Sequence, residues 1–111
     1  MKVYISLPIA GFESTVRKRF DEAKRYILEK YPDAIICGPV NIDYFDDNGL
    51  TVEHTHEWSW YMGEDVKILL DCTHIFMCRG FLNSRGCKDE LAIAREDGKF
   101  IFYANDAFSS L

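Results

Sequence analysis

The sequence predicts a small doubly wound α/β domain, with a mostly parallel sheet of four to five strands and flanking helices, over residues 1–111. Three observations lead to this prediction. Short apolar, β-branched runs alternate along the chain with longer segments in which apolar residues recur every three or four positions. Glycine and proline separate several of these segments. Such alternation is typical of a parallel sheet covered by helices, and a chain of this length suits one domain.

The first half of the chain predicts a strand, a helix, a second strand and a long loop. Residues 2–6 (KVYIS) are β-branched and aromatic, and a turn, LPIAGF, follows them. Residues 13–30 carry one apolar face at helical spacing, and Pro32 ends that helix. Residues 34–37 (AIIC) form a short buried-strand run. Residues 38–56 show no period, so we expect a long loop that serves as a lid or a binding loop or is disordered.

The second half of the chain predicts two more helix–strand pairs. A helix over 57–71 precedes a buried strand over 73–78 (THIFMC), and the loop RGFLNS follows. A further helix over 85–97 ends at Gly98, a residue suited to a C-terminal cap. The strand FIFY, residues 100–103, is the last predicted element, and the final eight residues have no clear assignment.

The strand order decides whether this sheet has a ligand crevice. A doubly wound order of 2-1-3-4 places a switch point between the first and third strands, at their carboxyl ends. The loops LPIAGF and RGFLNS follow those two strands. A simple order of 1-2-3-4 would have no such crevice.

Composition narrows the classes of partner. The net charge of −5 disfavours nucleic acids and anionic membranes, although a local basic site could still hold one phosphate. No run of about 18 apolar residues predicts a membrane span, and no signal-peptide pattern is present. The four cysteines are not spaced as in zinc sites, so we expect reduced thiols, no metal and a cytoplasmic location.

The stretch SRGCKDELAIA holds the strongest candidate for chemistry. Successive helical residues point about 100° apart, so Asp89 and Glu90 cannot face the same site. Glu90 shares a small-residue face with Gly86 and Ala94, which leaves room for a ligand. Asp89 has Arg85 four residues before it, as in a surface ion pair. The alternative for Glu90 is a solvated acid near a helix N-terminus.

Other residues near the expected crevice have two interpretations each. Ser84 could cap the helix, and the helix N-terminus could also hold an anion. Arg79 and Arg85 could bind a phosphate or lie on the surface. Tyr4 is either core or a hydroxyl that reaches the ligand, and Gly11 permits a tight turn.

An HxH pair and several aromatic residues follow the long loop. His54 and His56 could hold a metal on a strand, but no third ligand is evident nearby, so we favour a solvated or lid role. Trp58, Trp60 and Tyr61 are expected in the core or at a subunit contact, although a nucleobase could stack on one of them.

Two segments resemble known proteins. MKVYISLPIAG is similar to the first strand and substrate loop of the nucleoside 2-deoxyribosyltransferase-like superfamily, which has a flavodoxin/Rossmann-like fold. DCTHIFMCRGFLNSRGCKDELAIAREDGKFIFY, residues 71–103, resembles the DUF4406 family. The resemblance implies cleavage of the N-glycosidic bond of a deoxynucleoside or deoxynucleotide, by a 2-deoxyribosyltransferase or a hydrolase that needs no cofactor. It also implies a homodimer or a larger homo-oligomer.

The resemblance assigns roles to particular residues. Glu90 would be the nucleophile that attacks the anomeric carbon, Tyr4 would position or activate it, and Ser84 matches a loop serine that contacts phosphate. The substrate-binding residues that we expect are Ser6, Pro8, Gly11, Arg79, Ser84 and Gly86.

The sequence departs from the superfamily pattern at Leu7, Thr73 and Ser84, the last of which replaces an aspartate of the transferases. Glycosidic cleavage also needs an acid for the leaving group. A neighbouring subunit could supply that acid, as could Asp46, Asp47 or Asp71. The alternatives to an enzyme are a non-catalytic nucleotide-binding domain and a protein-interaction domain that uses the aromatic residues of 57–61.

Overall fold

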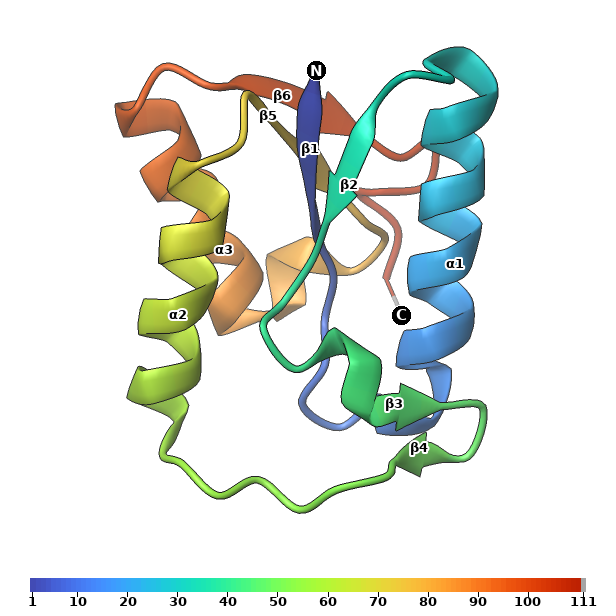
Figure 1. The fold of residues 1–111 in the computed structure, drawn as a ribbon, viewed down its shortest axis with the longest axis vertical. Helices are drawn as coiled ribbons and strands as arrows, with labels where there is room; N and C mark the ends of the chain where they lie inside the picture. The colour runs from blue at the N-terminus through green and yellow to red at the C-terminus, as the bar shows by residue number, and fades with distance from the viewer. Residues whose placement is uncertain (111) are drawn as a thin grey trace.

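The computed structural model describes residues 1–110 and has the predicted doubly wound architecture (Figure 1). Four parallel strands lie in the order β2-β1-β5-β6, which confirms the order 2-1-3-4. The strands are β1 (Lys2–Ser6), β2 (Ile35–Cys37), β5 (His74–Met77) and β6 (Phe100–Tyr103). The helices are α1 (Glu13–Lys30), α2 (Trp58–Leu70) and α3 (Arg85–Glu96).

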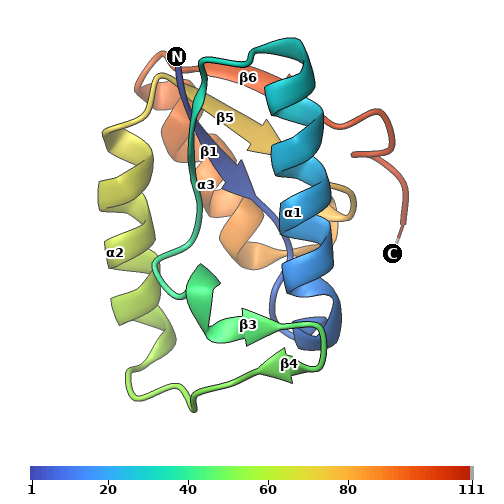
Figure 2. The ribbon, with the colours of Figure 1, turned by 45° about the vertical axis from the view of Figure 1, so that its right-hand side comes forward.

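Helix α1 covers one face of the sheet, and α2 and α3 cover the other, as both ribbon views show (Figures 1 and 2). The alternation of β1 assigns its side chains to these faces. Val3 and Ile5 pack in the core beneath α1, whereas Tyr4 and Ser6 point toward α2 and α3. All four residues are fully buried, so β1 is the central strand of two separate cores.

The expectation of a structureless loop over 38–56 is wrong for its middle part. A 3₁₀ turn (Ile42–Tyr44) leads into a short antiparallel hairpin of β3 (Phe45–Asp46) and β4 (Gly49–Leu50). Phe45 is 2% exposed and packs in the core beneath α1, which anchors the hairpin. A periodicity test misses strands of two residues because they are too short to show a period.

The predicted start and end of α3 are both capped. Ser84 accepts a hydrogen bond from the backbone N–H of Cys87 at 3.2 Å, as an N-cap residue does. At the other end Gly98 has a φ of 70°, and its N–H donates to the carbonyl of Arg95 while that of Lys99 donates to Ala94. These two backbone hydrogen bonds form a Schellman motif, which confirms Gly98 as the C-terminal cap.

The switch point lies between β1 and β5, which pair with each other in parallel. The loops that follow these two strands meet at the carboxyl edge of the sheet, where α3 begins. Within residues 1–110, no helix has the length and apolar character needed to cross a membrane.

Candidate active site

Glu90 lies buried on the inner face of α3, and both of its carboxylate oxygens accept hydrogen bonds. The hydroxyl of Tyr4 donates to Oε2, and the hydroxyl of Ser6 donates to Oε1 at 2.7 Å. Only 5% of Glu90 is exposed. Tyr4 and Ser6 are two residues apart on β1 and therefore point to the same face of the sheet. The fold thus fixes the carboxylate from both sides, which rules out the solvated alternative for Glu90.

Burial controls the protonation of Glu90. Removal from water raises the pKa of its carboxyl group from 4.5 to about 7. The bonds from Tyr4 and Ser6 favour the ionised form and oppose this rise, whereas the negative charges of Asp65 and Asp89 add to it. Burial also raises the pKa of Tyr4 well above 10, so its hydroxyl stays a donor at neutral pH. Both forms of the Glu90 carboxyl group are therefore populated near pH 7.

A cavity of about 380 Å³ opens beside Glu90, at the switch point of the sheet. Its wall includes Leu7 and Pro8 from the loop after β1, and Ser84 and Gly86 from the start of α3. Gly86 has no atoms within 4 Å of the place where a Cβ would stand, so the helix surface is open there. A cavity of this size suits a small molecule.

A second carboxylate, Asp65 of α2, lines the same cavity. Burial raises the pKa of Asp65 from 3.8 to about 6, while the hydrogen bond that it accepts from the N–H of Val40 at 2.7 Å opposes the rise. The charge of Asp65 in turn adds to the rise in the pKa of Glu90.

Asp65 was not among the acids expected from the sequence. Asp46 is in the β3–β4 hairpin with Asp47 beside it, and Asp71 forms an ion pair with Lys2, so none of these three lines the Glu90 cavity. Asp65 lies three residues after Met62 and four before Leu69, on the inward side of α2. A charged residue within an apolar helical stripe is the sequence signal that could have found it.

The structure gathers some of the other predicted site residues around Glu90 but not all. Pro8, Ser84 and Gly86 line the cavity. Gly11 has a φ of 84° in the turn after β1 and donates its N–H to the carboxylate of Glu13 at 3.1 Å; its two neighbours in the chain line the cavity, but Gly11 does not. Arg79 is exposed and lines a different hollow, beside α1.

Arg85 stands at the mouth of the cavity instead of Arg79. Its guanidinium stacks over the ring of Trp58 at 4.1 Å, and its Nε lies 3.9 Å from the carboxylate of Asp89. The Asp89 pairing is the one expected from the sequence. Arg85 is also the first residue of α3, so a cation and the helix N-terminus adjoin the cavity together.

Aromatic and imidazole rings form the opposite wall of the cavity. His56 stacks on Trp60 at 3.8 Å, and the hydroxyl of Tyr61 accepts the N–H of Thr55 at 3.1 Å. His54 Nε2 lies 3.0 Å from the amide nitrogen of Asn41, a buried residue that also lines the cavity. Within the described part of the chain, no three His, Cys, Asp or Glu side chains gather closely enough to hold a metal.

Cys87 is a potential competing nucleophile, since it lines the cavity one helical turn before Glu90. Burial raises the pKa of its thiol to about 11, although bonds with Ser6 and Ser84 oppose the rise. The thiol therefore stays protonated at neutral pH, and a protonated thiol is a poor nucleophile.

Comparison with known proteins agrees with the fold. The solved structure of a 2-desoxiribosyltransferase from Leishmania mexicana superposes with a TM-score of 0.63 and 15% sequence identity. The match covers 92% of this chain but 62% of that one, so this chain spans about three fifths of its length. At this identity the likeness shows a related α/β fold. No curated protein sequence matches the chain.

A sequence-family match covers the chain more completely. Residues 1–103 match the family described as "Domain of unknown function (DUF4406)". The matched region runs from the first strand through the last and includes the Glu90 site and both strands of the switch point. The chain belongs to the DUF4406 family.

Proposed function

We propose that this protein cleaves the N-glycosidic bond of a deoxynucleoside or deoxynucleotide, with Glu90 as the nucleophile. The observation that carries this proposal is a carboxylate buried beside a cavity and held by two hydroxyl donors, with a second carboxylic acid, Asp65, in the lining of the same cavity. The likeness of the fold to a protein described as a 2-desoxiribosyltransferase supports the same class of reaction. Retaining glycosidases use this pairing of two carboxyl groups.

The first step forms a covalent ester. The Glu90 carboxylate attacks the anomeric carbon while the bond from that carbon to the base nitrogen breaks, and the base takes the electron pair. Asp65, with a pKa of about 6, donates its proton to the departing base. In the second step Asp65, now ionised, takes a proton from water, whose oxygen displaces Glu90. A second base displaces Glu90 instead if the protein is a transferase.

Tyr4 and Ser6 position the nucleophile. Each hydroxyl donates to a different oxygen of Glu90, so the carboxylate plane cannot rotate without breaking one bond. Both bonds also favour the ionised form that attack requires. Pro8, Ser84 and Gly86 would contact the sugar or its 5′ substituent, since they line the wall next to Glu90.

The proposal is tested by incubating the protein with a panel of deoxynucleosides and their 5′-monophosphates. Chromatography measures the free base that is released. We expect turnover in the parent protein and a loss of at least about a thousandfold in Glu90→Gln. Glu96→Gln is the matched control, since it removes an exposed carboxylate of the same helix that does not line the cavity. Absence of base release with every substrate would reject the enzyme. If nucleotides then still raised the melting temperature, a non-catalytic nucleotide-binding domain would be the better description.

The role of Asp65 has a separate test. Asp65→Asn cannot donate a proton, so we expect base release to slow by about a hundredfold for an ordinary purine or pyrimidine. A substrate whose leaving group departs without protonation, such as a deoxyriboside of a nitrophenol, should react at nearly the parental rate. Equal losses with both substrates would show that Asp65 is not the acid.

A further inference from the structure

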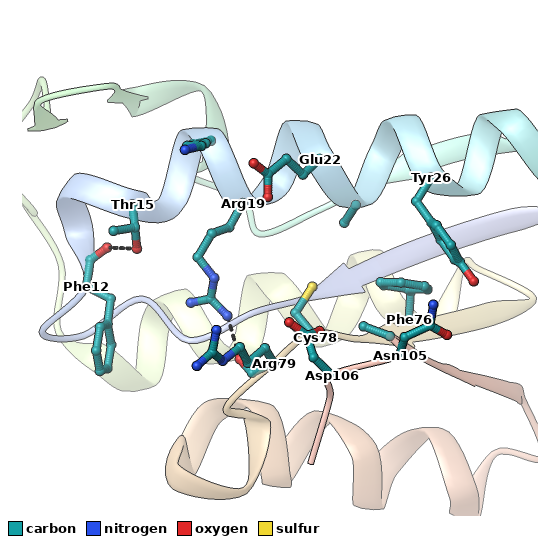
Figure 3. A pocket seen from close by; sticks show the side chains of 13 residues that line it. Phe12, Thr15, Arg19, Glu22, Tyr26, Phe76, Cys78, Arg79, Asn105 and Asp106 are labelled. Atoms are coloured by element: carbon teal, nitrogen blue, oxygen red, sulfur yellow. Dashed lines mark hydrogen bonds between the residues drawn. The ribbon is translucent and has the colours of Figure 1, made fainter. Parts of the chain in front are cut away.

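A second hollow, of about 600 Å³, lies on the face of the sheet opposite the Glu90 cavity (Figure 3). Helix α1 covers this face of the sheet within residues 1–110, and the hollow lies between α1, the end of β5 and the segment after β6. Phe76 of β5 forms part of its floor, and the segment of Asn105 and Asp106 after β6 forms its far side. Phe12 is the one residue of 1–110 that lines both cavities.

The hollow has more positive than negative side chains, although the chain as a whole has a charge of −5. Lys18, Arg19 and Arg79 line it, together with two carboxylates, Glu22 and Asp106. Among residues 1–110, none of these three cations has a carboxylate within 4.0 Å. The basic side chains are therefore not neutralised by direct ion pairs within this part of the chain.

Arg19 is the residue that points most directly to a ligand. Its Nη2 donates to the backbone carbonyl of Arg79, whereas its Nη1 is buried and has no hydrogen-bond partner among residues 1–110. The guanidinium of Arg79 lines the same hollow and donates to the carbonyl of Ser110 at 2.9 Å and 3.2 Å (Figure 3). Two guanidiniums that line one hollow can bind one anion together.

Apolar and aromatic side chains line another part of the hollow. The rings of Tyr26 and Phe76 lie 5.9 Å apart, and Ala23 and Ala104 complete a surface of low polarity beside the guanidiniums. A simple inorganic anion would leave this surface without a partner. The arrangement suits a molecule with an anionic group at one end and a flat apolar body at the other.

We propose that this hollow is a second ligand site, which binds a small organic phosphate monoester. The phosphate lies between Arg19 and Arg79, because guanidiniums bind phosphate oxygens in pairs of charge-assisted bonds. The apolar body of the ligand packs against Tyr26 and Phe76. Because its lining shares only Phe12 with the Glu90 cavity, this site does not depend on the proposed glycosidic activity.

Phenyl phosphate is a suitable probe, since it has both parts of the expected ligand. Titration into the ¹⁵N-labelled protein, followed by amide chemical shifts, should show saturable changes along 15–23 and 104–106. Calorimetry should show at least about tenfold weaker binding to Arg19→Gln. Arg25→Gln is the matched control, since Arg25 is exposed on α1 and does not line the hollow. Inorganic phosphate should bind more weakly than phenyl phosphate.

Several outcomes would overturn the proposal. They are the absence of saturable binding, chemical shift changes centred on Glu90, and equal affinities of Arg19→Gln and Arg25→Gln. Circular dichroism spectra of the variants check that each is folded. If Arg19→Gln fails to fold, Arg79→Gln tests the same anion site, because Arg79 is exposed and its loss leaves α1 intact. Binding of phenyl phosphate should be unchanged in Glu90→Gln, whether or not that residue is catalytic.

Discussion

The two ends of the sheet hold their buried charges in opposite ways. At the end where the strands begin, the side chain of Lys99 is 8% exposed, and its amine donates to the carbonyls of Leu70 and Cys72 and lies 2.8 Å from the carboxylate of Asp97. At the carboxyl end, Glu90 and Asp65 are removed from water, and neither forms an ion pair within residues 1–110. Burial raises the pKa of both carboxyl groups, and the charge of Asp65 adds to the rise for Glu90.

This difference separates a stabilising arrangement from a reactive one. Removal of a buried charge with three partners destabilises the fold, because those partners are left unsatisfied. A buried carboxylate without a cation raises the energy of the fold and has a pKa near neutrality, which is what proton transfer requires. Substitutions at the two ends should therefore change stability in opposite directions.

The largest expected effect on stability is at Glu90, and it depends on pH. The folded protein keeps the Glu90 proton up to a pKa of about 7, whereas the unfolded chain releases it near 4.5. The free energy of unfolding therefore falls by about 3 kcal/mol between pH 4.5 and 7 because of this one group. Urea unfolding of Glu90→Gln should lack this fall, so the variant gains stability relative to the parent as the pH rises. Glu96→Gln, an exposed change on the same helix, should follow the parent. A constant difference between Glu90→Gln and the parent at all pH values would contradict the burial argument.

A change at Lys99 should have the next largest effect, with the opposite sign. Lys99→Met keeps the length of the side chain but removes three donors, so the carbonyls of Leu70 and Cys72 lose a partner. We expect the free energy of unfolding to fall by about 2 kcal/mol at all pH values between 5 and 8. Base release should not change, because Lys99 is outside the Glu90 cavity. Lys88→Met, on the exposed side of α3, is the control. Unchanged stability would show that water replaces the amine easily.

A smaller effect is expected at Tyr4, on the pH profile rather than on stability. Tyr4→Phe removes one of the two hydroxyls that favour the ionised form of Glu90, so the pKa of Glu90 rises further. Attack requires ionised Glu90, so the acidic limb of base release moves to higher pH. Relative to the parent at the same pH, we expect about a tenfold lower rate at pH 6 and a smaller difference at pH 9, where ionisation of Asp65 slows both proteins. Tyr44→Phe, at an exposed position, should leave the profile unchanged. A uniform loss at every pH would assign Tyr4 a purely structural role.

The sequence predicted the carboxyl end of the sheet and Glu90 as the site, but it did not predict Asp65 as the second acid. Helix geometry separated Glu90 from Asp89, and the structure places Glu90 in the core and Asp89 beside Arg85. The alternation of strands and helices predicted a parallel sheet but left the strand orders 2-1-3-4 and 1-2-3-4 open, and the structure has the first. Asp65 was missed because it comes from α2, whose distance from α3 is set by packing and not by sequence spacing. Arg79 was expected in the crevice because it lies in the right loop, but its side chain turns to the other face of the sheet.

The smallest expected effect on stability is at Asp71. It tests whether an ion pair stabilises the Lys99 end of the sheet without burial. Asp71 forms an ion pair with Lys2 at the same end as Lys99, and this pair lowers the pKa of Asp71. The side chain of Asp71 is 73% exposed, however, so water and salt screen the attraction. Urea unfolding of Asp71→Asn at pH 7 should have the same midpoint urea concentration as that of the parent, both in low salt and in about 0.5 M sodium chloride. A loss as large as that of Lys99→Met would mean that pairing stabilises this end without burial. The stability difference between the two ends of the sheet would then come from whether a charge has a partner of opposite sign, and not from whether it is buried.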